Sequence, residues 1–447
     1  MSRPARRRVV ITGLGPVSAF GVGMAPLWQA MIEGRSALRP IARWDASGLP
    51  TSAAAEIPAE LFDVKSYVPK SYRKATKVMA RDIELAVGAA HEAVRDAGLL
   101  TKSMEGSAEG ATPTLSPDRV GCHIGAGLIA ADIDELTTAL YTARDEAGTF
   151  SYALWGTQGM SNLTPLWLLK YLPNMLACHV TIIHDCQGPS NTITCAETSA
   201  ALSIGESMRV IERGDADACL SGGAEARLHP MGMLRQVFAK RLAPTPEGVD
   251  PATVVRPFDP AATGGLLGEG GGILVLEALD SATARGATPI AEVAGYAAAQ
   301  CFCPDTVGVM VNETGEEIAA AMANAIADAG IGADAIDAIV PFGSGIAHLD
   351  AAEAAAMGKV FGSRATSIPV IQVMPFVGNC GAGCGALSVA IAAQCLRTQT
   401  LPARINTTRS SLVANAAPSS SARLGHILVS TTSLGGQTAA IVLRAHP

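Results

Sequence analysis

The sequence is poor in aromatic and in charged residues. Only 4% of its 447 residues are aromatic and 16% are charged, whereas 49% are hydrophobic. A chain of this length and composition can bury a large core of small aliphatic side chains, as about two domains or one large duplicated domain. Its net charge of −7 gives no basic excess for phosphate groups, so we expect no nucleic-acid partner.

Cysteine patterns typical of metal sites or disulfide frameworks are missing. The ten cysteines form no Cys-x-x-Cys pair and have no regular spacing. Cys380 and Cys384 lie four positions apart, but no second pair of ligands accompanies them, so we expect no zinc or other metal. Since no secretory leader is evident either, this pattern predicts reduced thiols in a cytoplasmic protein.

Long hydrophobic runs are absent. The positive mean hydropathy comes from alanine and valine spread along the chain, and no run of about 20 apolar residues is available to span a bilayer. We therefore expect no membrane association.

A glycine pattern near the N-terminus begins a nucleotide-binding motif without completing it. Residues 8–15 predict a buried strand that ends in a turn with Gly13 and Gly15. Ser18 replaces the third glycine of the dinucleotide motif, and no helix-opening pattern follows at once. We expect neither a dinucleotide nor another cofactor.

The most informative stretch is residues 188–205, in which a strand turns directly into a helix. A β-branched run at 192–194 leads into small residues and then into an amphipathic segment at 202–210. Residues at this turn lie at a helix N-terminus, where free backbone N–H groups and the helix dipole favour a thiolate, a carboxylate or an oxyanion. The turn therefore suits a nucleophile.

An internal repeat predicts a duplicated fold. Residues 86–98 and 318–330 are similar helical segments, each ending in a glycine. Each is followed by a strand, a Gly-x-Gly turn, a glycine-rich turn into a helix of small residues, and a closing strand with Gly-Gly. Two such units imply two mostly parallel sheets that share a central layer of helices. We place the join near residue 255, which gives halves 1–255 and 256–447.

The remaining patterns predict further helices, strands and one surface loop. Helices are expected at 26–33, at 71–98 and up to residue 178, a loop at 101–117, and strands at 120–124, 179–184 and 216–221.

Two motifs resemble those of the β-ketoacyl synthases of the thiolase superfamily. The first is Gly188-Pro-Ser at the start of the turn, with Gly205 fifteen residues after Ser190. The second is Arg256-Pro-Phe-Asp, followed by the glycine-rich segment 268–272. The resemblance covers nearly the whole chain. It implies an α/β, thiolase-like fold with a duplicated five-layered α-β-α-β-α architecture.

The resemblance places a glutamate where the family has its acyl-accepting cysteine. Seven residues after Ser190 stands Glu197, and this frame fits both flanks without a gap. Cys195 lies two residues earlier and is the alternative nucleophile, but it would need an insertion on one side and a deletion on the other.

The other site positions of the family are replaced as well. The two catalytic histidines, the lysine and the gating phenylalanine fall on Phe342, Asn379, Met374 and Leu434. Claisen condensation needs a soft nucleophile for the acyl chain and two imidazoles that stabilise the enolate. Phenylalanine can donate no hydrogen bond, and a carboxylate at the turn would form only a labile anhydride. The resemblance therefore implies a site without condensation chemistry.

Three roles are open for Glu197. Thr194-x-x-Glu197 has the form of a capping box, in which the carboxylate bonds the Thr194 backbone for about 1 kcal/mol. Glu197 could instead be the base or nucleophile of a repurposed cavity, as in an acyl hydrolase or lyase. A third possibility is a pair with a group on a partner chain.

These replacements resemble the chain-length-factor subunits of type II polyketide and polyene systems. The resemblance implies a subunit that pairs with an intact ketosynthase as a heterodimer, helps to shape its acyl tunnel and works with an acyl carrier protein in polyketide or fatty-acid-like biosynthesis. Two alternatives remain, which are an enzyme with a reused cavity and a homodimeric acyl-binding scaffold.

The same resemblance predicts how the chain associates. Strand 179–184 would pair with its counterpart across a two-fold axis, because an open edge rich in β-branched residues needs a partner. The turn around 125–131 would then face the shared acyl tunnel, with Leu128, Ala130 and Leu434 on its wall.

Overall fold

The computed structural model describes residues 6–103, 112–301, 312–433 and 435–446, and within them twelve strands form one continuous mixed sheet. Nine of these strands lie in the order β10 (Ala338–Val340), β13 (His426–Thr432), β14 (Gln437–Ala445), β9 (Ala291–Gln300), β1 (Val9–Ser18), β8 (Leu267–Ala278), β7 (Ala218–Ala226), β5 (Val120–Ala126) and β6 (Ser190–Ile193). The short strands β2 (Gly21–Val22), β3 (Arg39–Pro40) and β4 (Ala53–Ala55) attach beside β1 and β8, and β11 (Thr400–Leu401) pairs separately with β12 (Ser420–Ser421).

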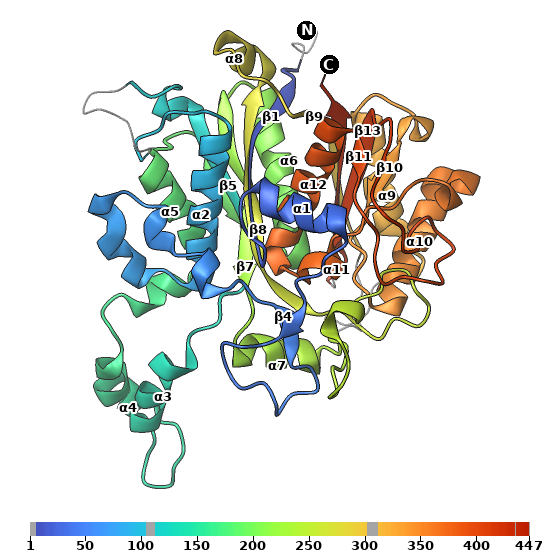
Figure 1. The fold of residues 1–447 in the computed structure, drawn as a ribbon. Helices are drawn as coiled ribbons and strands as arrows, with labels where there is room; N and C mark the ends of the chain where they lie inside the picture. Colours follow the sequence, from blue (N-terminus) through green and yellow to red (C-terminus); the bar gives the residue numbers. More distant parts are fainter. Residues whose placement is uncertain (1–5, 104–111, 302–311, 434, 447) are drawn as a thin grey trace.

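Helices fill the centre of the folded sheet and cover its outer faces (Figure 1). The central layer is α6 (Ser199–Glu212) with α12 (Cys384–Thr398), and the outer layers are α2 (Arg81–Asp96) with α5 (Met175–His184) and α9 (Glu316–Asp328) with α10 (Ala347–Phe361). Every residue of α12 from Cys384 to Leu396 is buried, as in a helix enclosed on all sides. The expected thiolase-like α/β fold is confirmed.

The remaining helices are short and lie mostly at the periphery. They are α1 (Met24–Glu33), α3 (Ile133–Thr142), α4 (Tyr152–Leu154), α7 (Pro230–Phe238), α8 (Leu279–Ala284) and α11 (Met374–Val377). Over the described ranges, no helix combines the length and the apolar character that crossing a bilayer requires.

The fold is duplicated, as the internal repeat predicts. The expected two mostly parallel sheets are wrong, because β1 pairs with both β8 and β9 and so joins the halves into one mixed sheet in which antiparallel pairs are frequent. The unit of β1, α2, β5, α6, β7 and β8 recurs as β9, α9, β10, α12, β13 and β14, with the same parallel and antiparallel pairings. Gly98 and Gly330 follow α2 and α9 with φ of 64° and 70°, the left-handed conformation that ends a helix. Since β8 pairs with β1 and β7, we propose that the halves join between β8 and β9 rather than near residue 255.

The glycines after the first strand serve packing. A Cβ atom on Gly13 would lie 2.2 Å from the Ala93 carbonyl oxygen, and one on Gly15 would lie 2.0 Å from that of Ala89. These glycines let α2 lie directly on β1. The same contact recurs in the second half, where a Cβ on Gly295 would lie 2.3 Å from the Ala325 oxygen.

Two predicted elements differ from the structure. Residues 179–184 are the end of helix α5, so the predicted strand is wrong. Leu176, Val180 and Ile183 are spaced to bury one face of a helix, and this packing overrides the strand preference of the β-branched run. The predicted helix 71–98 is interrupted, since residues Lys70–Val78 are 3₁₀ and α2 begins at Arg81. Part of the loop predicted at 101–117 lies outside the described residues.

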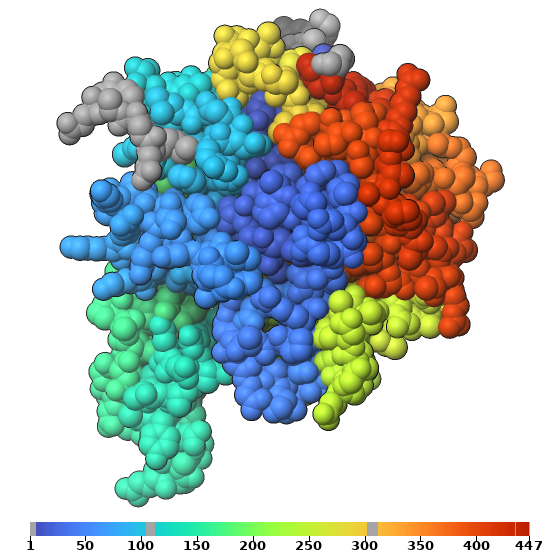
Figure 2. Space-filling model, viewed as in Figure 1, coloured from blue at the N-terminus to red at the C-terminus, as the bar shows by residue number. Residues whose placement is uncertain are grey.

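Residues 128–174 form a lobe that projects from the body of the molecule (Figure 2). The lobe exposes many large apolar side chains, namely Leu128, Ile133, Leu140, Tyr141, Phe150, Tyr152, Met160, Leu166 and Leu168. The sheet edge β6 pairs with β5 and with no other strand of the described chain. An apolar surface of this kind and an open sheet edge both mark an interaction site.

Candidate functional site

The turn between β6 and α6 carries Glu197 into the interior. Ala196 has a φ of 48°, which is rare for a residue with a side chain, and Glu197 follows in a 3₁₀ turn that continues into α6. Such a conformation costs about 1 kcal/mol or more and persists only where the surroundings hold it. Glu197 is 0% exposed at this position.

The Glu197 carboxylate is held by two arginines and an amide. Its Oε1 lies 2.9 Å from Arg241 Nη2, 3.1 Å from Arg227 Nη1 and 3.3 Å from Asn379 Nδ2. Burial opposes ionisation, but the charges of Arg241 and Arg227 outweigh it and lower the pKa of Glu197 to about 2. The predicted capping box is wrong, because the carboxylate bonds these side chains rather than the Thr194 backbone.

Further bonds fix the two arginines. Arg227, directly after β7, donates from Nε and Nη2 to the two oxygens of Glu225, at 2.6 and 2.7 Å. Glu225 Oε2 also accepts from the Ala382 N–H at 2.6 Å, and Arg241 Nη1 donates to Gln236 Oε1 at 3.1 Å. Two carboxylates and two guanidinium groups are thus balanced in a buried network, which we call the Glu197 network (Glu197, Glu225, Arg227, Arg241).

Asn379 is the predicted site residue that the fold brings to Glu197. It follows α11 and Gly378, donates to Glu197, and accepts at Oδ1 from the Gly381 N–H at 2.8 Å and from Cys384 Sγ at 3.4 Å. The fold places Asn379 and Glu197 in contact although 182 residues separate them. An amide in this setting is a fixed hydrogen-bonding group without a titrating proton.

Phe342 and Met374 lie in the apolar core. Both are buried in one hydrophobic cluster together with Cys380 and Cys384. The Phe342 side chain contributes no polar group, and its backbone N–H donates to Glu353 Oε1 at 2.8 Å. One of the two imidazole positions in the resemblance, Phe342, and the lysine position, Met374, are therefore filled by apolar side chains, whereas the other imidazole position holds the Asn379 amide.

Two buried carboxylates shape the loop after β10. Asp350 accepts from the N–H groups of Ser344, Gly345 and Phe258 at 2.7, 3.0 and 2.9 Å, and Glu353 accepts from those of Phe342 and Gly343. Burial raises the pKa of Asp350 to about 6 and that of Glu353 to about 8. Both side chains hold the loop that carries Phe342.

Cys195, the alternative nucleophile, lies in an ordinary environment. It is partly exposed, burial raises the pKa of its thiol, and its N–H donates to Ser199 Oγ at 2.8 Å. A reactive cysteine needs a lowered pKa, so this thiol is not activated. Within the described ranges, no three His, Cys, Asp or Glu side chains converge in a way that could hold a metal ion.

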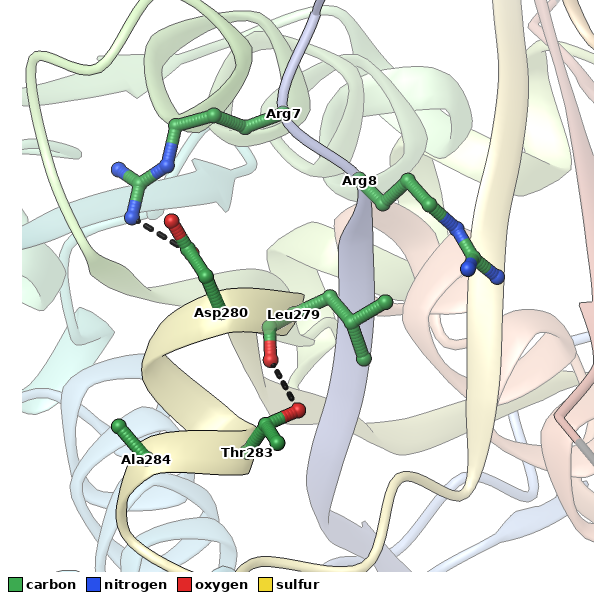
Figure 3. A pocket seen from close by; sticks show the side chains of 6 residues that line it. All are labelled: Arg7, Arg8, Leu279, Asp280, Thr283 and Ala284. Carbon is green, nitrogen blue, oxygen red and sulfur yellow. Dashed lines mark hydrogen bonds and ion pairs between the residues drawn. The ribbon is translucent and has the colours of Figure 1, made fainter.

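The tunnel role of Leu128, Ala130 and Leu434 remains a prediction. Leu128 is 67% exposed at the base of the lobe, Ala130 lines a cavity of about 580 Å³, and Leu434 lies outside the described residues. Another hollow, of about 650 Å³, lies between the start of β1 and α8 (Figure 3), where Arg7 donates to Asp280 at 2.8 Å. No residue of the Glu197 network lines either space.

Sequence reasoning missed Arg227, Arg241 and Glu225. The motif Glu225-Ala-Arg227 was a usable signal, because alternate residues at the end of a strand point to the same side. Arg241 gave no such signal, since a loop after α7 brings it back to Glu197.

Comparisons with known proteins agree with this fold. The description "Beta-ketoacyl synthase, N-terminal domain" matches residues 6–282, and "Beta-ketoacyl synthase, C-terminal domain" matches residues 290–408. The chain is 32% identical to 3-oxoacyl-(acyl-carrier-protein) synthase 2 of Coxiella burnetii, over 90% of this chain and 88% of that protein. It is 32% identical to nodulation protein E of Rhizobium meliloti, over 90% and 89% of the two chains.

A solved structure described as the ishigamide ketosynthase/chain length factor is also similar. It matches with a TM-score of 0.81 at 27% identity, covering 99% of this chain and 100% of that one. The chain therefore belongs to the β-ketoacyl synthase family of the thiolase superfamily.

Proposed function

We propose that this chain is a non-condensing chain-length-factor subunit that works with an intact ketosynthase in type II polyketide or fatty-acid-like biosynthesis. The observation that carries the proposal is the Glu197 network at the nucleophile turn. A buried carboxylate held by two guanidinium groups stands where the family needs a free thiolate. The similarity to the ishigamide ketosynthase/chain length factor supports the same role.

Among the described residues, the donors around Glu197 that could stabilise an enolate, Arg227, Arg241 and Asn379, are already bonded to carboxylates. Phe342 has no donor, and the Asn379 amide is committed to Glu197. The enolate formed on decarboxylation needs preorganised donors aimed at its oxygen. The condensing step is therefore assigned to the partner subunit.

The geometry does not favour Glu197 as a base. A carboxylate with a pKa of about 2 is a weak proton acceptor at neutral pH, and full burial gives a substrate no direct access. The alternative of a homodimeric scaffold differs from the proposed role in its partner, which would be a second copy of this chain instead of a ketosynthase. Co-expression with an intact ketosynthase separates the two, because the proposal requires a mixed pair that condenses and a lone chain that does not.

A basic surface supports a carrier protein as further partner. Five cationic side chains in and before the 3₁₀ segment are exposed, and residues 64–80 contain no acidic residue; the five are Lys65, Lys70, Arg73, Lys74 and Lys77. Such a surface attracts an acidic partner and accelerates its docking. We assign it to an acyl carrier protein.

The first prediction is that the purified chain alone forms no acyl adduct and no β-ketoacyl product. Neither Glu197 nor Cys195 is an activated nucleophile in this fold. Intact mass after incubation with acyl-CoA or acylated carrier protein measures the adduct directly. A stoichiometric adduct on Cys195 would refute the placement of Glu197 at the nucleophile position.

The second prediction concerns product length. Leu128→Phe or Ala130→Phe should shorten the product of the assembled pair. The larger side chain would fill part of the acyl tunnel near the boundary between the subunits and leave room for a shorter chain. Leu61→Phe changes an exposed leucine outside the lobe and is the matched control. Products of unchanged length from a fully assembled mutant pair would favour a scaffold role.

A further inference from the structure

A cavity of about 580 Å³ lies between the start of α2, the end of β7 and the first turn of α3. Its apolar wall includes Trp44, Ile129 and Leu228. The Trp44 Nε1 is already bonded to the Leu228 carbonyl oxygen at 3.2 Å. The indole ring also packs against the cluster of Ala54, Leu228, Met233 and Leu267, so it forms a fixed apolar part of the cavity wall.

Each cation on the cavity wall already has a carboxylate partner. The pairs are Arg43 with Glu269 at 2.6 Å and Glu56 at 3.1 Å, Arg81 with Glu84 at 3.1 Å and Glu269 at 3.4 Å, and Lys170 with Glu135. Burial lowers the pKa of His229, and its Nδ1 accepts a hydrogen bond from the Gly232 N–H. These groups offer no free positive charge to an anionic ligand.

Three carboxylates on the same wall have no cationic partner. Asp82, Asp132 and Asp134 form no ion pair within the part of the chain that the structure describes. Asp82 is 3% exposed, and its Oδ1 accepts a hydrogen bond from the Ala226 N–H at 3.1 Å. Burial, and then the neighbouring charge of Glu225, raise the pKa of Asp82 to about 7. A cation in the cavity would relieve both effects.

We propose that this cavity binds an organic cation, with a primary or secondary ammonium group on Asp82 and a short alkyl or aryl body against Trp44 and Leu228. The cavity joins an apolar surface to one buried carboxylate and to two exposed carboxylates at its mouth. That combination suits a charged head on an apolar body. No residue of the Glu197 network lines the cavity.

Calorimetric titration of the full chain with hexylammonium and benzylammonium tests the proposal. Both probes should bind at least tenfold more tightly than the isosteric hexanol and benzyl alcohol, and hexanoate should not bind. Asp82→Asn should lower the affinity for hexylammonium about tenfold or more, because it removes a charge-assisted bond. Glu247→Gln neutralises an exposed carboxylate that does not line the cavity and should leave binding unchanged.

The exposed mouth supplies a variant that should not disturb folding. The double variant Asp132→Asn, Asp134→Asn should lower the affinity for hexylammonium several-fold. This test remains possible even if Asp82→Asn does not fold. Equal binding of hexanol and hexylammonium, or unchanged affinity in these variants when folded, would overturn the proposal. Absence of ammonium binding at millimolar concentrations would overturn it as well.

Discussion

Glu197→Gln should lower the free energy of unfolding by about 3 kcal/mol or more, because it removes the negative charge shared by two buried guanidinium groups. Arg227 keeps Glu225 as a partner, but among the described residues Arg241 forms no other salt bridge and keeps the neutral oxygen of Gln236. Unfolding in urea measures the loss. Folded domains are stable by only about 5–15 kcal/mol, so the effect should be large. A capping glutamate would cost no more than about 1 kcal/mol.

A control on α6, the helix that follows Glu197, separates the buried network from a general effect of charge. Glu206 faces Arg213 at 3.7 Å, and both side chains are well exposed. Glu206→Gln should therefore change stability by less than about 0.5 kcal/mol. The double variant Glu197→Gln, Arg241→Gln should lose less than the sum of the single changes, because the Glu225–Arg227 pair stays balanced. A Glu197→Gln protein as stable as the wild type would show that the network does not stabilise the fold.

The same contacts determine how the difference in unfolding free energy between the wild type and Glu197→Gln depends on pH. The pKa of Glu197 falls from 4.5 to about 2 on folding, so its stabilising contribution is complete above about pH 4.5 and is lost as the pH falls toward 2. The wild type and Glu197→Gln should therefore differ by a constant amount between pH 6 and 8. The difference should shrink in acid.

The sequence predicted the architecture and the position of Glu197 because both depend on local patterns. Glycine stops, the repeated helix and the strand-to-helix turn are read within short windows. The partners of Glu197 come from distant segments, since Arg227 and Arg241 lie after β7 and α7. In the sequence, these two arginines cannot be told from ordinary surface arginines, because only the fold buries them.

Helix α5 shows a second limit of prediction from the sequence. The run 179–184 has the composition of a strand, and only the packing of its buried face decides for a helix. The sheet edge was therefore expected about ten residues too early, whereas β6 occupies residues Ser190–Ile193. The expectation of an open edge survives this shift, because β6 is the last strand of the sheet in the described chain.

Leu128→Asp combined with Ile182→Glu should separate the chain from the ketosynthase that we propose as its partner. Leu128 at the base of the lobe is 67% exposed, and Ile182 on α5 is 51% exposed. Burying a large aliphatic side chain contributes about 1.5–3 kcal/mol, and burying an unpaired charge instead adds a further cost. The two changes together should weaken association by about 4 kcal/mol, or about a thousandfold in Kd.

Sedimentation of the co-expressed pair over a range of concentrations measures this change, and Phe238→Asp is the matched control. Phe238 is 78% exposed, but it lies on α7, outside both the lobe and the β6 edge. A general loss of solubility or folding would affect both variants equally. Dissociation of the Leu128, Ile182 variant alone requires the base of the lobe and helix α5 to belong to the contact surface. If both variants stay associated at nanomolar concentration, the exposed apolar residues of the lobe serve another purpose and the partner binds elsewhere.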